Sequence, residues 1–347
     1  MRHRLEFQAD RIEMVLDMHR IPARVTGGTV TPRWIRFEVL PAVGAKISKI
    51  RRLSEELAAA LDTSNCRVAR RGAAVDLEIP RADPEPVRLL SLFRQMDDPE
   101  IPPVTAILGL AEDGGPLLIR LPSPDVAHVL VSGTTGSGKT VLLQTMILSL
   151  AMTNRPRDLA LILIDPKRTP FRPFEGLPHV SRTVVRDAGE ATEALESLVR
   201  LMETRGDPEV WVKGQPHVVL VIDELADLLM TGGRGVQEPL TRLLQRGRGA
   251  GVHVVAATQK PTAAVLGPLV KANFPVRLVG RVTSATDARV ASGWNGTGAE
   301  RLEGRGDFLA VAEGRVTRFQ TAYVSPEEIR EIVSEVSCDI AADGVVL

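Results

Sequence analysis

The stretch HVLVSGTTGSGKTVLLQTMILSL, His128 to Leu150, decides the fold of this chain. Its apolar start, HVLVSG, predicts a buried strand, and the chain then breaks into a glycine-rich turn. A lysine, a threonine and an apolar helix follow the turn. The turn GTTGSGKT matches G-x-x-x-x-G-K-[ST] in full and has the strand before it and the helix after it that this pattern requires. The stretch therefore predicts a phosphate-binding loop in an α/β domain.

Each residue type in this loop has a chemical reason. Glycines let backbone N–H groups turn inward onto phosphates, and the following helix adds the partial positive charge of its N-terminus. Lys139 is expected to reach the β- and γ-phosphates, and the hydroxyl of Thr140 is expected to bind Mg²⁺. The predicted nucleotide contacts are Gly133, Thr134, Thr135, Gly136, Ser137, Gly138, Lys139 and Thr140.

An acidic pair indicates what happens to the nucleotide. The buried run VVLVIDE ends in Asp223 and Glu224, and we expect Asp223 to hold Mg²⁺ and Glu224 to polarise the attacking water. Such a pair can also be only a helix N-cap, but beside a phosphate loop the catalytic interpretation is favoured. A further strand, LALILID, lies between the two motifs, as in ATPases with a catalytic glutamate and an inserted strand. The chain has no N-K-x-D-like motif for guanine, which favours ATP.

Two more polar residues are candidates for catalysis. The strand VHVVAATQ ends in Gln259, which could reach the γ-phosphate or the water but could equally be a polar strand terminus. Arg248 stands before the turn GAG and is expected to act as an arginine finger in a neighbouring subunit's site. Arg242 and Arg246 are expected only to complement a helix C-terminus. His253, inside the strand, is interpreted as a core or sheet-face histidine.

Composition sets the outer limits. The chain has 347 residues with 43 Lys and Arg against 43 Asp and Glu, so no global charge indicates a polyanionic partner, although a local patch could still bind one. No apolar run approaches the ~18 residues of a membrane span. The two cysteines, Cys66 and Cys338, lie near opposite ends and fit a reducing compartment. We therefore expect a cytoplasmic protein without an intrinsic membrane segment.

The chain divides by composition into three parts. Residues 1–80 predict a small α+β subdomain, in which ISKIRRLSEELAAALD is expected to form one amphipathic helix. Prolines mark residues 81–103 as a connector. Residues 104–347 predict a wound α/β domain of the RecA-like P-loop ATPase type, the additional-strand and catalytic-glutamate kind, with an antiparallel edge near the C-terminal end. Asp187 and Glu190 have capping-box spacing at one of its helices. The expected strands are HVLVSG, LALILID, HVVLVID, VHVVAAT, VRLVGRV and DFLAVA.

These motifs together resemble the motor of the FtsK/SpoIIIE DNA translocases. The resemblance runs in order from about His128 to Val311 and rests on GTTGSGKT, ILIDPKR, VVLVIDELADLLM, LLQRGRGAGVHVVAATQKP, LVKANFPVRLVGRVTSATDARV and GAERLEGRGDFL. The front unit, with RIEMVLDMHRI and RWIRFEVLPAVGAKISKI, is similar to the small α subdomain that precedes this motor. The resemblance implies a hexameric ring that threads double-stranded DNA and hydrolyses ATP between its subunits.

The resemblance also implies roles for single residues. Arg248 aligns with the finger arginine, Gln259 with the sensor, and Lys260 and Arg289 with basic residues on the loops that face DNA. A second basic position of the family falls on Ala285, which implies a weaker grip on DNA.

Three further departures bear on the biological role. The segment 202–217 is shorter than in chromosomal translocases, and neither a membrane anchor nor a C-terminal winged-helix domain is evident. A plasmid, an integrative element or a phage is thus as good a source of DNA as a chromosome, and a separate membrane protein could recruit the motor.

Two other classes of function stay open. A type VII secretion-like ATPase shares this fold but acts on protein substrates, and it usually carries several ATPase domains. A non-motor protein would bind ATP only as a switch. The presence of both Glu224 and Arg248 favours a motor over a switch.

Overall fold

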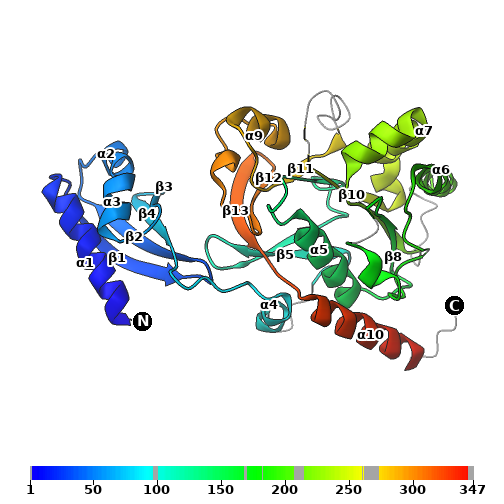
Figure 1. Cartoon of the computed structure of the whole chain (residues 1–347), viewed down its shortest axis with the longest axis horizontal. Helices are drawn as coiled ribbons and strands as arrows, with labels where there is room; N and C mark the ends of the chain where they lie inside the picture. The colour runs from blue at the N-terminus through cyan, green and yellow to red at the C-terminus, as the bar shows by residue number, and fades with distance from the viewer. Residues whose placement is uncertain are drawn as a thin grey trace. The chain divides into compact units, whose positions relative to one another are not determined.

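The computed structural model describes residues 2–96, 101–167, 170–181, 183–206, 215–259, 261 and 273–342. The chain divides into two compact units, Met1–Pro86 and Val87–Leu347. Figure 1 labels elements of both units where there is room. Each unit has its own core and is described by itself.

The first unit is a four-stranded antiparallel sheet with helices packed on it. The strand order is β1-β2-β4-β3. Alternate strand residues such as Phe37, Val39, Leu77 and Ile79 join Ile12 and other helix residues in one buried cluster. The elements are α1 (Arg2–Met18), β1 (Ala23–Val30), β2 (Trp34–Pro41), α2 (Ile47–Arg52), α3 (Ser54–Ala60), β3 (Arg67–Arg71) and β4 (Ala74–Pro80).

The prediction of one continuous helix in this unit is wrong. The segment forms two short helices, α2 and α3, which meet at Leu53, where the backbone leaves helical geometry with ψ at 16°. The Ser54 hydroxyl donates to the carbonyl of Arg51 at this joint, 2.8 Å away. Ile50, Leu53 and Leu57 are nevertheless all buried. The apolar spacing therefore identified the buried face correctly but not the break in the backbone.

The second unit is built on a nine-stranded mixed sheet of order β6-β5-β13-β12-β11-β7-β10-β9-β8. The strands from β11 to β8 are parallel, and the others pair antiparallel. The elements are α4 (Leu89–Gln95), β5 (Thr105–Ala111), β6 (Pro116–Arg120), β7 (Val129–Ser132), α5 (Lys139–Thr153), β8 (Leu159–Ile164), η1 (Arg172–Phe174), α6 (Ala188–Thr204), β9 (His217–Ile222), α7 (Leu225–Arg246), η2 (Gly247–Ala250), β10 (Val252–Thr258), β11 (Val276–Val279), α9 (Ala285–Ser292), η3 (Ala299–Arg301), β12 (Asp307–Ala312), β13 (Arg315–Thr321) and α10 (Pro326–Ala342).

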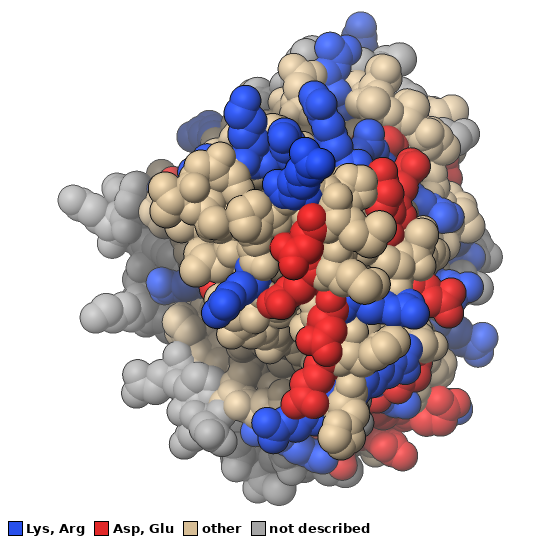
Figure 2. Space-filling model, turned by 90° about the vertical axis from the view of Figure 1, so that its left-hand side faces the viewer, with Lys and Arg blue, Asp and Glu red and all other residues tan. Residues whose placement is uncertain are grey.

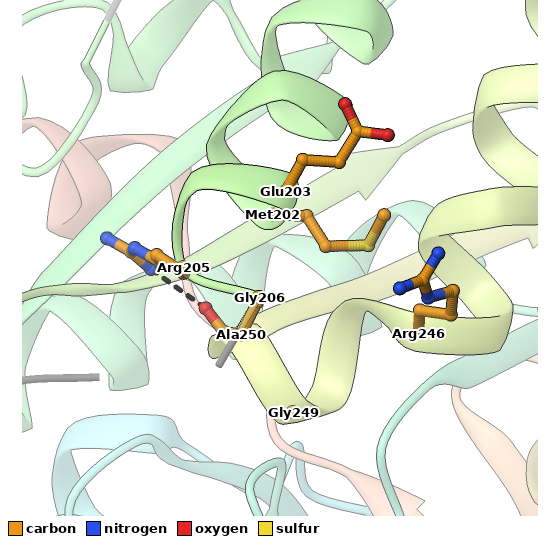
Figure 3. A pocket seen from close by; sticks show the side chains of 7 residues that line it. All are labelled: Met202, Glu203, Arg205, Gly206, Arg246, Gly249 and Ala250. Atoms are coloured by element: carbon orange, nitrogen blue, oxygen red, sulfur yellow. Dashed lines mark hydrogen bonds between the residues drawn. The ribbon is translucent and has the colours of Figure 1, made fainter. Parts of the chain in front are cut away.

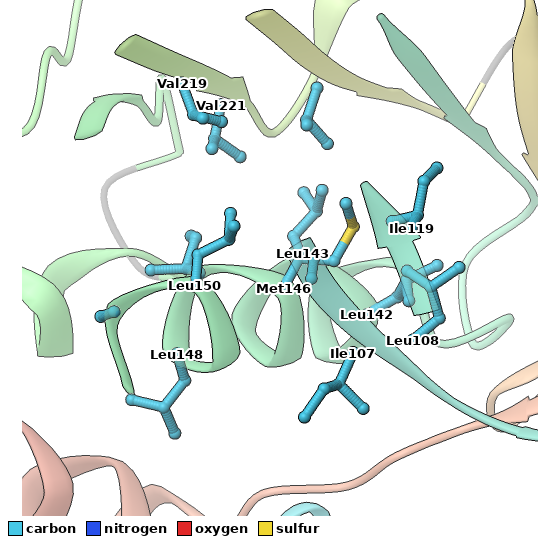
Figure 4. Close-up of a cluster of buried hydrophobic side chains, with 14 of the residues drawn as sticks. Ile107, Leu108, Ile119, Leu142, Leu143, Met146, Leu148, Leu150, Val219 and Val221 are labelled. Atoms are coloured by element: carbon cyan, nitrogen blue, oxygen red, sulfur yellow. The ribbon is translucent and has the colours of Figure 1, made fainter. Parts of the chain in front are cut away.

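Both faces of the parallel half are covered. In β9, Val219 and Val221 point into the cluster that contains α5, while Leu220 and Ile222 point into the cluster that contains α6 and α7. Figure 4 shows the first of these clusters, in which α5 packs against strand residues. Side chains of a strand alternate between faces, so a strand buried on both reads as a continuous apolar run. All six predicted strands are confirmed, as β7 to β12.

The antiparallel part is larger than predicted. Beyond β12 it contains β13 and the hairpin β5–β6, which were not among the expected strands. Gly109 interrupts β5 with φ at 152°, and a Cβ at this position would stand 2.0 Å from the carbonyl oxygen of Gln320 on β13. The glycine is needed for close approach of two strands, and it is also what breaks the apolar run.

The predicted cap of α6 is confirmed, because the Asp187 carboxylate accepts from the backbone N–H of Glu190 at 2.9 Å, and Glu190 in turn accepts from the N–H of Arg186 at 2.8 Å.

No helix in the part of the chain that the structure describes combines the length and the apolar character needed to cross a bilayer.

Three histidines form a row near the amino-terminal edge of the sheet. His128 precedes β7, His253 lies in β10 and His217 begins β9, and these three strands are neighbours. The ring nitrogens of His217 and His253 lie 3.2 Å apart, and Nδ1 of His253 donates to the carbonyl of Ala127 at 3.1 Å. Burial lowers the pKa of His253 to about 3 and the pKa values of His128 and His217 to about 4. The interpretation of His253 as a core histidine is confirmed, since it is fully buried.

These histidines should make the fold sensitive to acid. Between the lowered pKa values and the ordinary value of about 6.5, the unfolded chain binds more protons than the folded chain, so the free energy of unfolding falls as pH falls. One histidine like His253 should lower it by about 2 kcal/mol between about pH 7 and about pH 5. Denaturant titrations across this range should show a smaller pH dependence for His253→Gln than for the wild type. The exposed His19 provides the control, and an equal slope in His253→Gln would contradict the assignment.

Candidate functional site

The parallel strands bring the predicted nucleotide residues to one edge of the second unit. The phosphate loop follows β7, the acidic pair follows β9 and Gln259 follows β10. These strands lie in the order β7-β10-β9 and run parallel, so their carboxyl ends meet at the same edge. Ligands of open α/β sheets bind at this edge.

The phosphate loop is held in a turn that only glycines allow. Gly136 and Gly138 have φ of 79° and 102°, and Gly138 directly precedes α5. A Cβ on Gly138 would stand 2.6 Å from the backbone nitrogen of Gly306, in the loop before β12. Gly306 also donates its N–H to the carbonyl of Ser137 at 2.8 Å, and Arg305 donates to the carbonyl of Gly136 at 2.9 Å. The loop is therefore fixed from outside by the segment that leads into β12.

Lys139 is folded back onto the backbone of the loop. Its Nζ donates to the carbonyl oxygens of Gly133 at 2.5 Å and Thr134 at 3.2 Å. Burial lowers its pKa to about 8, although the nearby carboxylates of Glu224 and Asp223 raise it. The charged amine is thus in a place where burial disfavours its charge. An anion in the loop would offer it a better partner than two carbonyls.

The acidic pair is also buried. Asp223 and Glu224 are 6% and 3% exposed, at the point where β9 ends and α7 begins. Burial raises the pKa of Asp223 to about 6, while the amine of Lys167 lowers it. Glu224 occupies the N-cap position of α7 but makes no cap hydrogen bond with its side chain. Its carboxylate is therefore not used as a helix cap, which was the alternative interpretation of this pair.

Gln259 connects the acidic pair to the phosphate loop. Its backbone N–H donates to both carboxylate oxygens of Glu224, at 3.2 and 3.1 Å. Its side-chain oxygen accepts from the hydroxyl of Thr135 at 3.0 Å. The three expected components of the site thus form one hydrogen-bonded chain. Ser137, inside the loop, keeps a buried hydroxyl that has no hydrogen-bond partner among the described residues.

One residue of this site had no predicted role. Lys167 follows β8 in the motif IDPK, and its Nζ lies 3.6 Å from Oε2 of Glu224 and 3.9 Å from Oδ2 of Asp223. Its side chain is 39% exposed. Lys167 could have been predicted as part of the site if the strand before it had been known to pair with the strand that carries the acidic pair. The order of strands in a sheet cannot be read from a single sequence.

Arg248 lies at the other end of the strands. It belongs to η2, immediately before β10, whereas Gln259 follows β10. The side chain is exposed, and its Nη1 donates to the carbonyl of Pro124 at 2.9 Å. Seven strand residues separate the two edges, a rise of about 20 Å. Arg248 therefore cannot reach the phosphate loop of its own chain.

The structure describes one of the two predicted DNA contacts, Arg289. Arg289 is an exposed residue in the last turn of α9, a helix that begins with a hydrogen bond from the N–H of Asp287 to the Ser284 hydroxyl at 3.1 Å. Ala285, the first residue of α9, is exposed as well. Lys260 lies outside the described residues.

A separate pocket of about 280 Å³ is not part of the nucleotide site. Figure 3 shows it between the end of α6 and η2, lined by Met202, Arg246 and others. The buried guanidinium of Arg205 donates here to the carbonyls of Ala250 and Pro216, both at 3.0 Å. These bonds tie α6 to the segments that precede β9 and β10, so Arg205 has a structural role.

Comparison of whole sequences finds DNA translocases among the relatives of this chain. The chain is 33% identical over 360 residues to the DNA translocase FtsK of Sporosarcina ureae, covering 95% of this chain and 46% of the relative. It is 32% identical over 363 residues to the DNA translocase SpoIIIE of Bacillus subtilis, covering 94% of this chain and 45% of that protein. The chain thus spans less than half the length of these curated relatives.

Solved structures share the fold. The conjugation coupling protein TcpA of pCW3, in a monomer form with ATPγS, has a TM-score of 0.64 at 18% identity and covers 94% of this chain and 99% of its own. The cytoplasmic domain of the type VII secretion ATPase EccC of Thermomonospora curvata has a TM-score of 0.61 at 25% identity, over 73% of this chain and 34% of its own. These likenesses confirm the predicted fold class, a P-loop ATPase domain preceded by a small α+β unit.

Two family models match the chain, one over each of its two units. The FtsK alpha domain matches residues 1–81, and the FtsK/SpoIIIE family model matches residues 99–208 and 206–263. The second match includes the phosphate loop, the acidic pair and Gln259. The chain belongs to the FtsK/SpoIIIE family and combines its alpha domain with its motor.

Proposed function

We propose that this chain hydrolyses ATP to move double-stranded DNA through a homo-hexameric ring. The observation that carries the proposal is the hydrogen-bonded chain from Thr135 through Gln259 to Glu224, which joins the phosphate loop to the acidic pair. The names of the relatives, DNA translocase FtsK and SpoIIIE, supply the choice of DNA.

The first step of the proposed mechanism is binding of the triphosphate. The backbone N–H groups of Gly133 to Thr140 and the N-terminus of α5 bind the phosphates, and Lys139 leaves its carbonyl partners for the β- and γ-oxygens. The loop fits this role because its left-handed glycines leave room for the phosphates and because the buried hydroxyl of Ser137 has no partner among the described residues. Thr140 and Asp223, whose oxygen donors suit Mg²⁺, would hold the ion, and it would supply positive charge against the phosphate oxygens.

The second step is attack by water. Glu224 accepts a proton from a water molecule while the water oxygen forms a bond to the γ-phosphorus. The bond from that phosphorus to the β–γ bridging oxygen breaks, and ADP and inorganic phosphate result. Gln259 holds Glu224 through its backbone and touches the phosphate loop through its side chain, so it can register whether the γ-phosphate is present.

The third component comes from a second copy of the chain. Because Arg248 lies about 20 Å from its own phosphate loop, its guanidinium can stabilise the transferring phosphoryl group only in trans. The requirement for a partner motivates the ring, and the sixfold symmetry follows from the family resemblance.

Contact with DNA is assigned to local basic residues. The chain as a whole has 43 Lys and Arg against 43 Asp and Glu, and on the face drawn in Figure 2 Lys and Arg gather in the upper part while Asp and Glu run down the middle. Arg289 and Lys260 are proposed to contact phosphates, which requires few cations per subunit when six subunits contribute. A motor that uses ATP and DNA would work in the cytoplasm, on chromosomal DNA or on the DNA of a mobile element.

A secretion ATPase is the second candidate. The fold is shared with the type VII secretion ATPase EccC, at a TM-score close to that of the coupling protein TcpA. The identity of 33% over 95% of this chain to a DNA translocase, against 25% over 73% to EccC, favours DNA. Stimulation of ATP hydrolysis by duplex DNA but not by a peptide would support the translocase.

The catalytic assignment predicts a separation of binding from turnover. Glu224→Gln should still bind ATP but lose about 10²-fold or more in kcat, because the water is no longer deprotonated. Lys139→Ala should lose ATP binding itself, because the loop then lacks its cation. Equilibrium binding of a fluorescent ATP analogue and steady-state phosphate release measure the two quantities. Turnover of Glu224→Gln near the wild-type rate would reject the assignment.

The trans role of Arg248 predicts complementation between two inactive variants. Arg248→Ala and Lys139→Ala should each be inactive alone, and mixing them should restore part of the activity. In a mixed ring, an intact phosphate loop can face an intact arginine. The measurement is ATP turnover across mixing ratios in rings shown to exchange subunits. Absence of recovery at every ratio would count against a finger in trans.

The DNA assignment predicts how binding changes with salt. Arg289→Ala should weaken binding about equally for unrelated duplexes and reduce the slope of log K against log salt by roughly one unit for each phosphate that is no longer neutralised. Basal ATP turnover without DNA should be unchanged, because Arg289 stands in the last turn of α9 and has no proposed role at the phosphates. Arg330→Ala, an exposed arginine on α10, is the matched control. A weakening confined to one duplex, or an unchanged slope, would show that Arg289 does not bind phosphates.

A further inference from the structure

We propose that Lys167 is a positioning residue that holds the carboxylate of Glu224 for attack by water. The inference deepens the function proposed above and rests on it. Lys167 stands shortly beyond Ile164, the last residue of β8, at the carboxyl edge and beside β9, and its Nζ lies 3.6 Å from Oε2 of Glu224. The same nitrogen lies 3.9 Å from Oδ2 of Asp223.

Glu224 needs a second point of attachment. Among the residues that the structure describes, its carboxylate has two polar partners, the backbone N–H of Gln259 and the amine of Lys167. The N–H lies near both oxygens, so by itself it leaves the carboxylate free to swing about that point. A cation beside Oε2 distinguishes the two oxygens and leaves Oε1 for the water. Misplacement of a catalytic group by about an ångström is enough to slow a reaction substantially.

The other lysine of the site cannot do this work. Lys139 is bound to the carbonyls of Gly133 and Thr134 in this structure, and in the proposed mechanism it turns to the phosphates. Two adjacent buried carboxylates repel one another unless a cation lies between them. Lys167 contacts both, so it is the group that can balance them whether or not nucleotide is bound.

The exposure of Lys167 makes the inference testable. The side chains of Asp223 and Glu224 are buried, whereas the side chain of Lys167 is 39% exposed. Shortening or neutralising it leaves no cavity in either core cluster. Because the neutral variant leaves two buried carboxylates without this cation, a thermal melt of each variant is recorded beside its kcat to separate loss of folding from loss of turnover.

The test compares Lys167→Met, which keeps the apolar stem, with Lys167→Arg, which keeps the charge. In Lys167→Met we expect kcat for ATP to fall about tenfold or more, while the Kd for ATPγS stays within about threefold of the wild type. Lys167→Arg should retain most of the turnover. Lys49→Met, an exposed lysine of α2, is the control and should match the wild type. Unchanged kcat in Lys167→Met, or weaker ATPγS binding that accounts for the whole effect, would overturn the role.

A double variant checks that Lys167 acts through Glu224. In the Glu224→Gln background, Lys167→Met should cause no further decrease in single-turnover rate, because the charge that Lys167 holds is already gone. A further decrease of about tenfold would place Lys167 on the phosphates instead. If Glu224→Gln keeps its turnover, the proposed function and this inference both fail. If Glu224→Gln loses turnover and Lys167→Met does not, only the inference about Lys167 fails.

Discussion

Parallel pairing of β7 with β10, and of β10 with β9, is the constraint on which the site depends. In register, Ser132 of β7 stands beside Thr258 of β10, and Ile222 of β9 stands beside Ala256. The phosphate loop, Gln259 and the acidic pair each begin within a few residues of these positions. No side chain has to reach far, because the backbone hydrogen bonds of the sheet already place the three segments together. The chemistry of the site is thus a consequence of strand register.

The antiparallel half of the sheet supports the phosphate loop from the other side. Arg305 and Gly306 donate backbone hydrogen bonds to the loop, and Gly306 accepts one from the N–H of Thr321 on β13 at 2.7 Å. Arg305 is a non-glycine residue with φ at 52°, and its carbonyl accepts from the side chain of Gln320 at 3.0 Å. Strained backbone of this kind persists only where surrounding contacts fix it. Movement of the phosphate loop would therefore displace the ends of β12 and β13 to which it is hydrogen-bonded.

The sequence predicted the parts of this arrangement that depend on local pattern. Strands β7 to β12 were visible because burial on both faces leaves an apolar run, and the loop was visible because left-handed turns need glycine. The hairpin β5–β6 was missed, because Gly109 is required by its close contact with β13, a strand that is distant in the sequence. The break at Leu53 was missed because both halves of the helix bury the same face. Lys167 was missed for a related reason, as its contact with Glu224 exists only once β8 and β9 are known to be neighbours.

The charges of the site give a physical reason why ATP hydrolysis would depend on assembly of the subunits. Burial disfavours the charge on Asp223, whose pKa rises to about 6, and on Lys139, whose pKa falls to about 8. Lys139 would gain from an anion in the loop and Asp223 from a cation beside it, so a nucleotide that binds there together with Mg²⁺ stabilises the folded state. The γ-phosphate of a bound nucleotide would still need the cation of an arginine, because the chain's own Arg248 stands at the opposite edge of β10. On the proposed function, binding can occur in one chain, but rapid hydrolysis has to wait for the arginine of a second, and this order of events would link each turnover to the contact between subunits.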